Sequence, residues 1–502
     1  MNQGKICISI CAETATELFE KIRPAEQLAD VIEIRFDCLE PIQIGIVLDG
    51  LPQTAKQFLL TFRPANQGGR REIDPVERTA FWKTAVERFK EQNIIFDQEF
   101  SWRWPENRPD KVTVVSLHDF GTPRSDLEIF YAELSKIDCL ALKLAQTADD
   151  AIDAIPLWKL LERAVAESRN LIPIAMGEAG KWTRILGLAH GAYMTYAALD
   201  EGSETAPGQI TAKDMIEVFG VKDLNRNTEV YGIIAGDTSY SMSPFIHNPA
   251  FRAAGMNRVF VPLQVKDVAE FIRRMVRLET REFDLNFRGF SVTNPHKQAI
   301  IAYLDEIDDM ATAIGAVNTV RIDGQKLVGF NTDAPGFILP LTQKFGDIKG
   351  ARVALFGAGG AARACIYAMK EAGAEVTVFA RDETKAKKLA EAFGCRSSSL
   401  PATRQSLQAD ILVNATPVGT KGRFESEAIV KGDQMKGVKL VYDLIYNPEE
   451  TLLIREARAS GCETLGGLDM LIGQAVHQFE MWTGHTPSLD VMLSAARKRL
   501  SK

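Results

Sequence analysis

The stretch 138–146, "DCLALKLAQ", alternates along its length in the manner of a β-strand. Leu140, Leu142 and Leu144 share one face, and Lys143 lies among small residues on the other. Burying a charge costs free energy unless the charge is paired, so a lysine within an otherwise apolar strand requires an explanation. The surroundings of Lys143 therefore bear on both the fold and the function of the chain.

Similar short strands recur between helical patterns before residue 220. Eight are expected, near residues 5–10, 31–36, 57–62, 93–97, 111–117, 138–144, 171–175 and 191–195. Eight strand–helix units in a segment of this length predict a (β/α)8 barrel. The polar segment 220–232 follows and predicts a domain boundary.

Polar residues repeatedly occupy the strand face that would point into the barrel lumen. They alternate with the large apolar residues and fall late in their strands: Glu33, Arg35, Asp37, Thr61, Arg63, Asp97, Glu99, Ser116 and His118. A purely structural core would not repeat this pattern, because buried polar groups are costly unless paired. Barrel active sites lie at the late ends of the strands, so the pattern predicts an active site there.

Lys143 in such a lumen is expected to have a pKa below the ordinary value of about 10.4, because burial and the nearby Arg35 and Arg63 disfavour the ammonium. A neutral amine can attack a ketone and form a Schiff base. His118 would then be the general base. The alternative is a structural lysine that extends its stem along the edge of a strand and keeps its charge in water.

Five motifs together resemble type I 3-dehydroquinate dehydratases over residues 4–215. They are "EIRFD" (33–37), "FLLTFR" (58–63) followed by Gly68-Gly69, "SLHDF" (116–120), "AMGEAGKWTRILG" (175–187) and "TAPGQ" (205–209). The resemblance implies a barrel in which Lys143 forms an imine with the ketone of 3-dehydroquinate. By the same resemblance, His118 removes the neighbouring proton and helps the hydroxyl leave as water.

The resemblance also implies a set of residues that bind the hydroxyls and carboxylate of the substrate. These are Glu33, Arg35, Arg63, Arg184, Thr205 and Gln209. The chain departs from the family pattern at two of these motifs. Gln67 stands where an acidic residue usually precedes the Gly-Gly pair, and Thr205 stands where a serine is usual.

A glycine turn, "LFGAGGAAR" (355–363), lies between the strand "ARVALF" and a helical segment. Its G-x-G-x-x-A pattern in this context predicts a Rossmann dinucleotide site. Backbone N–H groups of the turn would approach a pyrophosphate at the helix N-terminus. The residues expected at the cofactor are Gly357, Ala358, Gly359, Gly360 and Ala361. The alternative is a glycine-rich connector without a ligand.

The residues after the next strand, "EVTVFA" (375–380), favour NADP over NAD. Arg381 and Lys385 suit a 2′-phosphate, whereas NAD-specific sites usually carry a carboxylate at this place. Asp382 lies one position beyond Arg381, and we interpret it as a helix cap.

A further set of motifs resembles shikimate dehydrogenases over residues 229–500. It comprises "YSMSP" (240–244), "SVTNPHK" (291–297), "GAVNT" (315–319), "NTDAPGF" (331–337), "NATPVG" (414–419), "VYDLIYNP" (441–448) and "GGLDMLIGQA" (466–475), together with the glycine turn. The resemblance implies that Ser241 and Ser243 hold the substrate carboxylate. It implies that the ring hydroxyls are contacted by Thr293, Asn318, Asp333, Tyr446 and Gln474.

Lys297 and Asp333 are the implied acid/base pair for the hydroxyl that exchanges hydride with the nicotinamide. A carbonyl that gains hydride needs a proton donor beside it, and a lysine next to a carboxylate can supply one. Without the other motifs, a solvent-exposed lysine of a helix would be an equally good interpretation of Lys297. Asp309, Leu444 and Gly467 match positions that line the cofactor.

The dehydrogenase-like region also departs from its family pattern. Tyr240 occupies the place of a usual histidine before the Ser-x-Ser pair. Ala380-Arg381-Asp382 replaces Asn-Arg-Thr, and Ala334 replaces a glycine in "NTDG".

The composition excludes some classes of protein. The 502 residues are 46% hydrophobic and 25% charged, with a net charge of −7 and no basic run, so no nucleic-acid partner is expected. No apolar stretch reaches the roughly 18 residues that span a membrane, and no secretion signal is visible. The seven cysteines are scattered without a CxxC motif, so we expect reduced thiols, no metal site and a cytoplasmic location.

The sequence thus predicts an α/β chain that joins a (β/α)8 barrel (1–222) to a substrate-binding domain (229–340) and a Rossmann NADP-binding domain (341–465). The C-terminal helices (466–502) are expected to pack back on the substrate-binding domain. The small-molecule substrates would be 3-dehydroquinate, 3-dehydroshikimate and shikimate. The alternatives are a catabolic, NAD-dependent quinate/shikimate dehydrogenase, and a regulator built from degenerate copies of these domains.

Overall fold

A computed structural model of the chain describes residues 2–89, 92–101, 112–121, 126–400, 406–422 and 424–501. The first region contains eight strands: β1 (Lys5–Ile10), β2 (Val31–Arg35), β3 (Gln57–Thr61), β4 (Ile94–Glu99), β5 (Thr113–Asp119), β6 (Ala141–Thr147), β7 (Leu171–Met176) and β8 (Met194–Ala197). All eight predicted strands are confirmed, although the expected start of the fifth, residue 111, lies outside the described residues.

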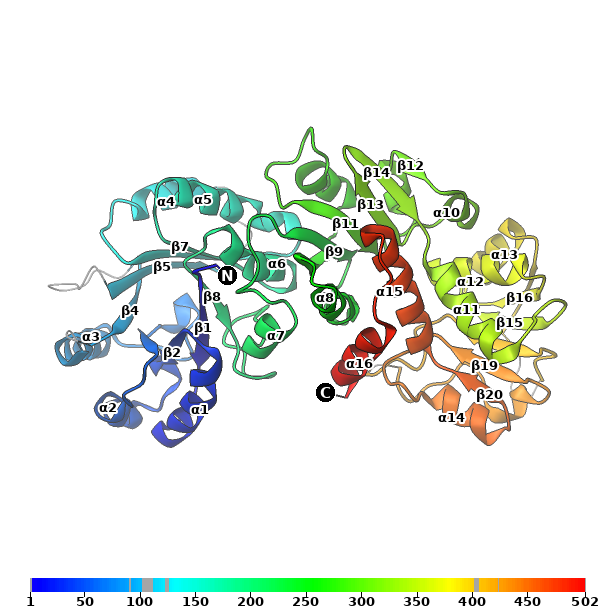
Figure 1. Ribbon diagram of the computed structural model, residues 1–502. Helices are drawn as coiled ribbons and strands as arrows, with labels where there is room; N and C mark the ends of the chain where they lie inside the picture. Colours follow the sequence, from blue (N-terminus) through cyan, green and yellow to red (C-terminus); the bar gives the residue numbers. More distant parts are fainter. Residues whose placement is uncertain are drawn as a thin grey trace. The chain divides into compact units, whose positions relative to one another are not determined.

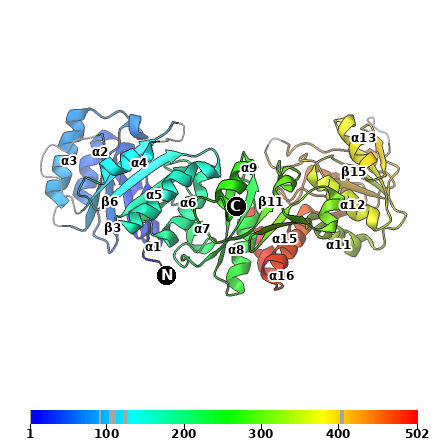
Figure 2. The same cartoon turned by 90° about the horizontal axis from the view of Figure 1, so that it is seen from above.

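These strands form one parallel sheet in the order β7-β6-β5-β4-β3-β2-β1-β8. β1 pairs with β8 as well as with β2, and the backbone N–H of Tyr193 donates to the carbonyl of Leu171, so the sheet closes on itself. Helices α2, α3 and α4 lie outside the strands in both views (Figure 1, Figure 2). The predicted (β/α)8 barrel is confirmed.

The helices of this region surround the strands in chain order. They are α1 (Ala15–Leu28), α2 (Pro41–Gly50), α3 (Pro75–Phe89), α4 (Leu127–Leu134), α5 (Ile155–Ala166), α6 (Lys181–Leu186) and α7 (Ala212–Glu217). Polar caps define where several of them begin. The hydroxyl of Thr14 accepts from the N–H of Glu17 at the start of α1, and that of Thr211 accepts from Asp214 at the start of α7.

Every strand of the barrel turns alternate side chains into the lumen. The apolar side chains among them are Cys7, Val31, Leu59, Ile95, Val114, Ala141, Ala145, Ile172, Ile174, Met176, Met194 and Tyr196. Ala141 and Ala145 flank Lys143 in the same alternating set of β6, and Lys143 itself lines the barrel cavity, so its predicted inward direction is confirmed. The prediction that Leu140 faces away from the lumen with Leu142 and Leu144 is wrong. Leu140 packs against the lumen cluster, because β6 begins only at Ala141 and Leu140 lies before its alternation.

A second sheet follows, in the order β10-β9-β11-β13-β14-β12. Its strands are β9 (Glu229–Ala235), β10 (Arg258–Gln264), β11 (Phe287–Val292), β12 (Glu306–Ile307), β13 (Thr319–Asp323) and β14 (Lys326–Phe330). β11 and β13 pair antiparallel, as do β13 and β14. The helices of this part are α8 (Ser243–Ala253), α9 (Val268–Phe271), α10 (Asp309–Ile314) and α11 (Asp333–Phe345).

The third sheet is parallel, in the order β17-β16-β15-β18-β19-β20. Its strands are β15 (Arg352–Phe356), β16 (Glu375–Phe379), β17 (Arg396–Ser398), β18 (Ile411–Asn414), β19 (Leu440–Asp443) and β20 (Glu463–Leu465). Helices α12 (Gly360–Glu371) and α13 (Glu383–Ala392) pack on one face and α14 (Leu452–Ala459) on the other. The strand order reverses beside β15, as in a Rossmann fold.

The chain divides into two compact units. One comprises Met1–Gly232, Gly236–Ser241 and Asn257–Asn286, and the other comprises Ile233–Ala235, Met242–Met256 and Phe287–Lys502. Within the second unit, α15 (Gly467–Thr483) packs against α11 and α8, and α16 (Leu489–Leu500) packs against α8. None of the helices in the described residues is long and apolar enough to cross a membrane.

The expectation that all thiols are reduced is wrong. Cys11 and Cys38 form a disulfide, with their Cα atoms 5.4 Å apart. They follow the adjacent parallel strands β1 and β2, whose ends the barrel brings together although 27 residues separate the two cysteines. The other cysteines, Cys7, Cys139, Cys365, Cys395 and Cys462, form no disulfide.

Two candidate active sites

The barrel contains a cavity of about 200 Å³. Eight of the residues predicted for this site line it: Glu33, Arg35, Arg63, His118, Lys143, Arg184, Thr205 and Gln209. They come from β2, the residues after β3, β5, β6, α6 and the segment after β8. The structure therefore brings together side chains that are up to 176 positions apart, from Glu33 to Gln209.

Lys143 lies deep in this cavity and is only 5% exposed. Its Nζ atom is 4.0 Å from the centroid of the Tyr196 ring and 3.6 Å from Oδ2 of Asp97. Burial lowers the pKa of Lys143 to about 8, and Arg63 contributes to the decrease, whereas Asp97 opposes it. The predicted direction is confirmed, and a usable fraction of neutral amine exists near neutral pH.

Asp97, on β4, connects the lysine to Arg63, which follows the neighbouring strand β3, and to Ser116 of the neighbouring strand β5. Its Oδ2 accepts from Nη2 of Arg63 at 2.5 Å, and its Oδ1 accepts from the hydroxyl of Ser116 at 2.5 Å. Burial alone would raise the pKa of Asp97, but Arg63 and Lys143 keep it below the ordinary value. Asp97 is therefore an anion between two cations, and it holds both of them in place.

His118 lies on β5, and both of its ring nitrogens are buried without a hydrogen-bond partner among the described residues. Its ring stacks on Phe120, with centroids 6.4 Å apart. Burial lowers the pKa of His118 well below the ordinary value, and Arg63, Lys143 and Arg35 lower it further. The imidazole is therefore neutral at neutral pH, which is the form that can accept a proton.

The polar groups of β2 are fixed before any ligand arrives. Arg35 donates from Nε and Nη2 to the two oxygens of Asp37, at 2.8 and 2.6 Å. Glu33 accepts from the hydroxyls of Ser9 and Thr61, the latter at 2.7 Å. Such pairing reduces the mobility of the side chains and leaves their remaining polar atoms for a ligand.

The last part of the barrel site consists of Arg184 and the loop after β8. Arg184 is 1% exposed and donates to the carbonyl of Pro207 at 3.3 Å. Burial lowers its pKa to about 10. The amide of Gln209 accepts from the N–H of Thr205 at 2.7 Å, and its nitrogen donates to the Thr205 hydroxyl at 3.2 Å. The loop is thus closed on itself beside the cavity.

The second candidate site surrounds Lys297 and Asp333. The Nζ atom of Lys297 forms an ion pair with Oδ2 of Asp333, and Nδ2 of Asn318 donates to Oδ1 of the same carboxylate at 2.7 Å. Asp333 is the first residue of α11, and Asn318 immediately precedes β13. Three of the predicted residues are therefore in direct contact.

The glycine turn lies next to this pair. A Cβ atom at Gly360, the first residue of α12, would be 3.1 Å from Cδ of Lys297, so the lysine stem passes over the turn. Gly357 has a φ of +124°, and a Cβ there would lie 2.7 Å from the carbonyl oxygen of Ala415. A Cβ at Gly359 would meet nothing within 4 Å, which leaves room beside the N-terminus of α12. The turn therefore fits a pyrophosphate.

Of the residues after β16, Asp382 has the role that was predicted for it. Asp382 caps α13, because its Oδ1 accepts from the N–H of Lys385 at 3.0 Å; this prediction is confirmed. Nζ of Lys385 lies 3.8 Å from Oδ2 of Asp382. Arg381 is exposed.

The other predicted residues of this site occupy the following places. Ser243 begins α8, Ser241 lies two residues before it, Thr293 follows β11, and Asp309 begins α10. Leu444 and Tyr446 follow β19, and Gly467 begins α15, where a Cβ would lie 2.2 Å from the carbonyl oxygen of Leu444. Gln474, on α15, packs its backbone against Gly336 of α11.

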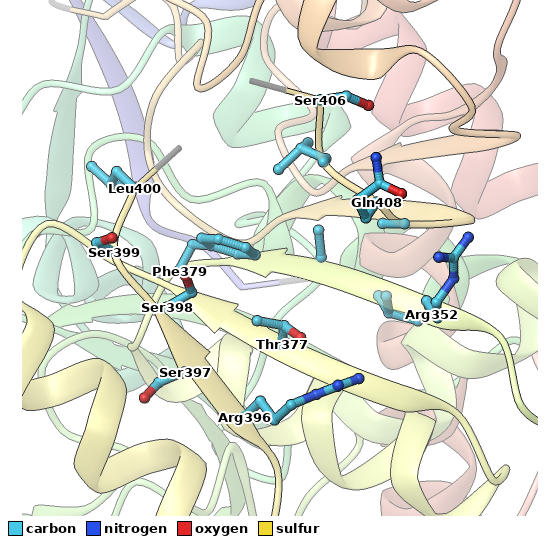
Figure 3. Close-up of a pocket in the computed structure, with 14 residues that line it drawn as sticks. Arg352, Thr377, Phe379, Arg396, Ser397, Ser398, Ser399, Leu400, Ser406 and Gln408 are labelled. Atoms are coloured by element: carbon cyan, nitrogen blue, oxygen red, sulfur yellow. The ribbon is translucent and has the colours of Figure 1, made fainter. Parts of the chain in front are cut away.

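A larger cavity of about 560 Å³ lies on the face of the third sheet that is turned away from α12 and α13. Figure 3 shows Thr377 and Phe379 of β16 on its floor, with the serines at 397–399 along one side. Its lining, as far as the described residues show it, contains none of the residues predicted to bind the cofactor. Leu400 and Ser406 line this cavity, and residues 401–405 between them lie outside the described part of the chain.

Sequence reasoning missed Tyr196, whose ring lies under Lys143. The predicted eighth strand stopped at residue 195, but the observed strand continues to Ala197. Continuing the alternation from Met194 would have placed Tyr196 in the lumen. No group of three or more His, Cys, Asp or Glu side chains that could hold a metal ion occurs in the described parts of the chain.

Comparison with known proteins finds four family models along the chain. Residues 6–226 match a model of type I 3-dehydroquinase, and residues 233–320 match the shikimate dehydrogenase substrate binding domain. Residues 341–445 match shikimate/quinate 5-dehydrogenase, and residues 467–497 match the C-terminal domain of shikimate 5'-dehydrogenase.

Individual relatives match either nearly the whole chain or about half of it. A bifunctional 3-dehydroquinate dehydratase/shikimate dehydrogenase of Arabidopsis thaliana, a chloroplastic protein, is 34% identical over 96% of this chain and 82% of its own. A shikimate dehydrogenase (NADP(+)) of Methanothermobacter thermautotrophicus is 38% identical over 55% of this chain and 98% of its own. A crystal structure of a shikimate dehydrogenase in complex with NADP+ covers 56% of this chain and 98% of its own, with 36% identity and a TM-score of 0.51.

A barrel with a buried lysine, joined to a Rossmann-containing module with a Lys–Asp pair, defines a two-site α/β enzyme. The extent and identity of the match to the Arabidopsis protein identify it further. The chain belongs to the family of bifunctional 3-dehydroquinate dehydratase/shikimate dehydrogenases.

Proposed function

We propose that the chain catalyses two consecutive reactions, dehydration of 3-dehydroquinate in the barrel and NADPH-dependent reduction of 3-dehydroshikimate at the Lys297 site. The observation that carries the proposal is the presence of both pairs of reactive groups in one chain. Lys143 has a lowered pKa and lies with His118 in one cavity, and Lys297 is paired with Asp333 beside the glycine turn.

The barrel groups suit an imine mechanism. The neutral amine of Lys143 attacks the ketone carbon, and loss of water gives the Schiff base. The imine withdraws electrons from the adjacent carbon, whose proton passes to neutral His118. The same imidazolium returns that proton to the departing hydroxyl, which leaves as water. Hydrolysis of the imine then releases the product and restores Lys143.

The remaining groups of the cavity would bind and orient this substrate. Arg35, Arg63 and Arg184 provide donors for its carboxylate and hydroxyls, and Glu33, Thr205 and Gln209 complete the polar wall. Asp97 is not among the described residues that line the cavity. It contacts Arg63 and Lys143, which do line it, and keeps both in position.

At the second site, bound NADPH would supply the hydride. Lys297 and Asp333 would give a proton to the carbonyl oxygen as it becomes a hydroxyl. We assign the substrate carboxylate to Ser241 and Ser243, and the ring hydroxyls to Thr293, Asn318, Asp333, Tyr446 and Gln474. The pyrophosphate is assigned to the turn 357–361 and the 2′-phosphate to Arg381 and Lys385, with Asp309, Leu444 and Gly467 lining the cofactor.

The domain limits that follow from these assignments are a barrel at 1–222, a substrate-binding domain at 229–340, a Rossmann domain at 341–465 and C-terminal helices at 466–502. A cytoplasmic location is part of the same proposal and is supported by the five cysteines that form no disulfide. Cell fractionation tests the location, and thiol counts on the extracted protein test whether Cys11 and Cys38 are joined there.

The direct experiment is to supply the purified full-length chain with 3-dehydroquinate and NADPH. Shikimate should accumulate while NADPH is consumed, and 3-dehydroshikimate should appear when NADPH is omitted. Quinate with NAD is the comparison reaction, because it would be preferred by a catabolic dehydrogenase. A chain that binds these compounds but turns over none of them would instead be a regulator.

A further inference from the structure

A chain of buried hydrogen bonds leads from α15 to the Lys297–Asp333 pair. We call it the α15 hydrogen-bond chain. Its members are His247, Ser291, Gln478, Thr319, Asn318 and Asp333, and all of them are buried. They lie in the second compact unit, on α8, β11, α15, β13, the residue before β13 and α11. Gln478 is the central member, and the predicted roles do not include it.

The orientation of the Gln478 amide follows from its neighbours. Its Nε2 atom faces the backbone carbonyl of Asn318 at 3.4 Å, and a carbonyl can only accept. Nε2 is therefore the donor, and Oε1 accepts from the hydroxyl of Ser291 at 3.0 Å and from Nε2 of His247 at 3.2 Å. Burial lowers the pKa of His247 to about 4, so the imidazole is neutral and carries its proton on Nε2.

This orientation determines where the Thr319 proton points. Nε2 of Gln478 donates to Oγ1 of Thr319 at 3.0 Å, which leaves the proton of that hydroxyl for another acceptor. The shorter of its two further contacts is to Oδ1 of Asn318 at 2.8 Å, and the other is to Oγ1 of Thr332 at 3.2 Å. With Oδ1 of Asn318 fixed as an acceptor, the Nδ2 atom must face Asp333, to which it donates at 2.7 Å. The opposite amide orientation would place an oxygen against the carboxylate.

The same helix face continues the connection in both directions. Gln474, Gln478 and Trp482 are spaced four residues apart on α15 and therefore share a face. Gln474 packs its backbone on Gly336 of α11, the helix that begins with Asp333. Trp482 donates from Nε1 to the carbonyl of Val320 at 3.1 Å and so fixes α15 to β13. Figure 1 shows α15 beside β11 and β13.

We propose that Gln478 is a positioning residue of the dehydrogenase site, which acts through Thr319 and Asn318 to hold the Asp333 carboxylate in the orientation that Lys297 requires. The inference rests on the proposed dehydrogenase function and deepens it. The N–H of Thr332 also donates to Oδ1 of Asn318, at 2.8 Å. Loss of Gln478 should therefore weaken the orientation without abolishing activity.

The test compares Gln478→Leu and Thr319→Val with their double mutant in the full-length chain. Each single change should lower kcat for 3-dehydroshikimate reduction about tenfold, because small misplacements of reacting groups are costly, and should alter KM much less. The double mutant should be no slower than the slower single mutant, since both changes break the same chain. Thr319→Ser keeps the hydroxyl and should restore kcat.

Two controls separate positioning from folding. Trp482→Phe changes another buried contact of α15, one turn along, and should lower the melting temperature while kcat stays near the wild-type value. Dehydration of 3-dehydroquinate should remain unchanged in every variant. If Gln478→Leu does not fold, the nearly isosteric Thr319→Val decides alone.

Wild-type kcat in Thr319→Val, or losses that multiply in the double mutant, would overturn the inference. A Trp482→Phe variant that lost as much kcat as Gln478→Leu would overturn it as well, because any disturbance of α15 would then suffice. A wild-type chain without dehydrogenase activity would instead overturn the proposed function, and the inference with it.

Discussion

The Nζ atom of Lys143 lies 3.6 Å from Oδ2 of Asp97, and the same oxygen accepts a hydrogen bond from Arg63. One carboxylate thus serves two cations in a buried lumen. It keeps the lysine in place, but it does not return the lysine pKa to its ordinary value, because burial and then the charge of Arg63 lower that pKa. This relationship leads to the first two predictions.

Borohydride added together with 3-dehydroquinate should label Lys143 covalently, because reduction converts the imine into a stable amine. Peptide mapping by mass spectrometry identifies the labelled residue. Lys297→Ala, which leaves the barrel intact, should be labelled as strongly as the wild type. A label on any residue other than Lys143 would falsify the imine assignment.

Asp97→Asn should make Lys143 reactive at lower pH. The carboxylate raises the pKa of Lys143, so its loss should bring that pKa below about 8. The measurement is the pH dependence of borohydride trapping, whose midpoint should move toward acid. The asparagine keeps an acceptor for the hydroxyl of Ser116. A midpoint that is unchanged or higher would show that Asp97 does not control the lysine.

Substitution of either lysine should silence one reaction and spare the other. Lys143→Ala should lose dehydration, because no imine can form, and should still reduce added 3-dehydroshikimate. Lys297→Ala should dehydrate 3-dehydroquinate and let 3-dehydroshikimate accumulate, since loss of a positioned acid/base group costs about 10²–10⁴ in rate. Assays of both half-reactions on each folded variant check this. Loss of both activities in one variant contradicts the separation of the sites.

Arg381→Asp should shift cofactor preference from NADP toward NAD. The change removes a cation from the proposed 2′-phosphate site and adds repulsion, and a charge-assisted hydrogen bond is worth about 1.5–3 kcal/mol. The ratio of kcat/KM values for the two cofactors measures the shift. Arg396→Asp, an exposed arginine of β17, is the matched control. Equal ratios in Arg381→Asp and wild type would remove Arg381 from the site.

Cys11→Ser with Cys38→Ser should destabilise the barrel by about 3–4 kcal/mol, because a link between residues 27 apart restricts the unfolded chain. The free energy of unfolding of the barrel is measured by denaturant titration, with loss of dehydratase activity as the signal. The wild-type protein should show five thiols when denatured without reductant and seven after reduction. Seven thiols before reduction would show that the bond is absent.

The sequence allowed prediction of what depends on local alternation. The inward direction of Lys143 follows from the period of its strand, and the cap role of Asp382 follows from its place before α13. Features that depend on which elements become neighbours were not predictable. The Cys11–Cys38 bond requires that β1 and β2 end side by side, and the contacts of Gln478 require α15 to lie on β13. Tyr196 was missed because the strand limit was set two residues early.

The walls of the barrel cavity carry more cations than anions. Among the residues that line it, Arg35, Arg63, Arg184 and Lys143 face a single carboxylate, Glu33. Such a cavity attracts an anion before any contact is made, so the rate of capture depends on the ionic strength of the medium. Salt should therefore slow the first step of the pathway at low substrate concentration and leave its maximal velocity nearly unchanged. In a cell, the supply of 3-dehydroquinate to this chain would be set partly by the surrounding electrolyte.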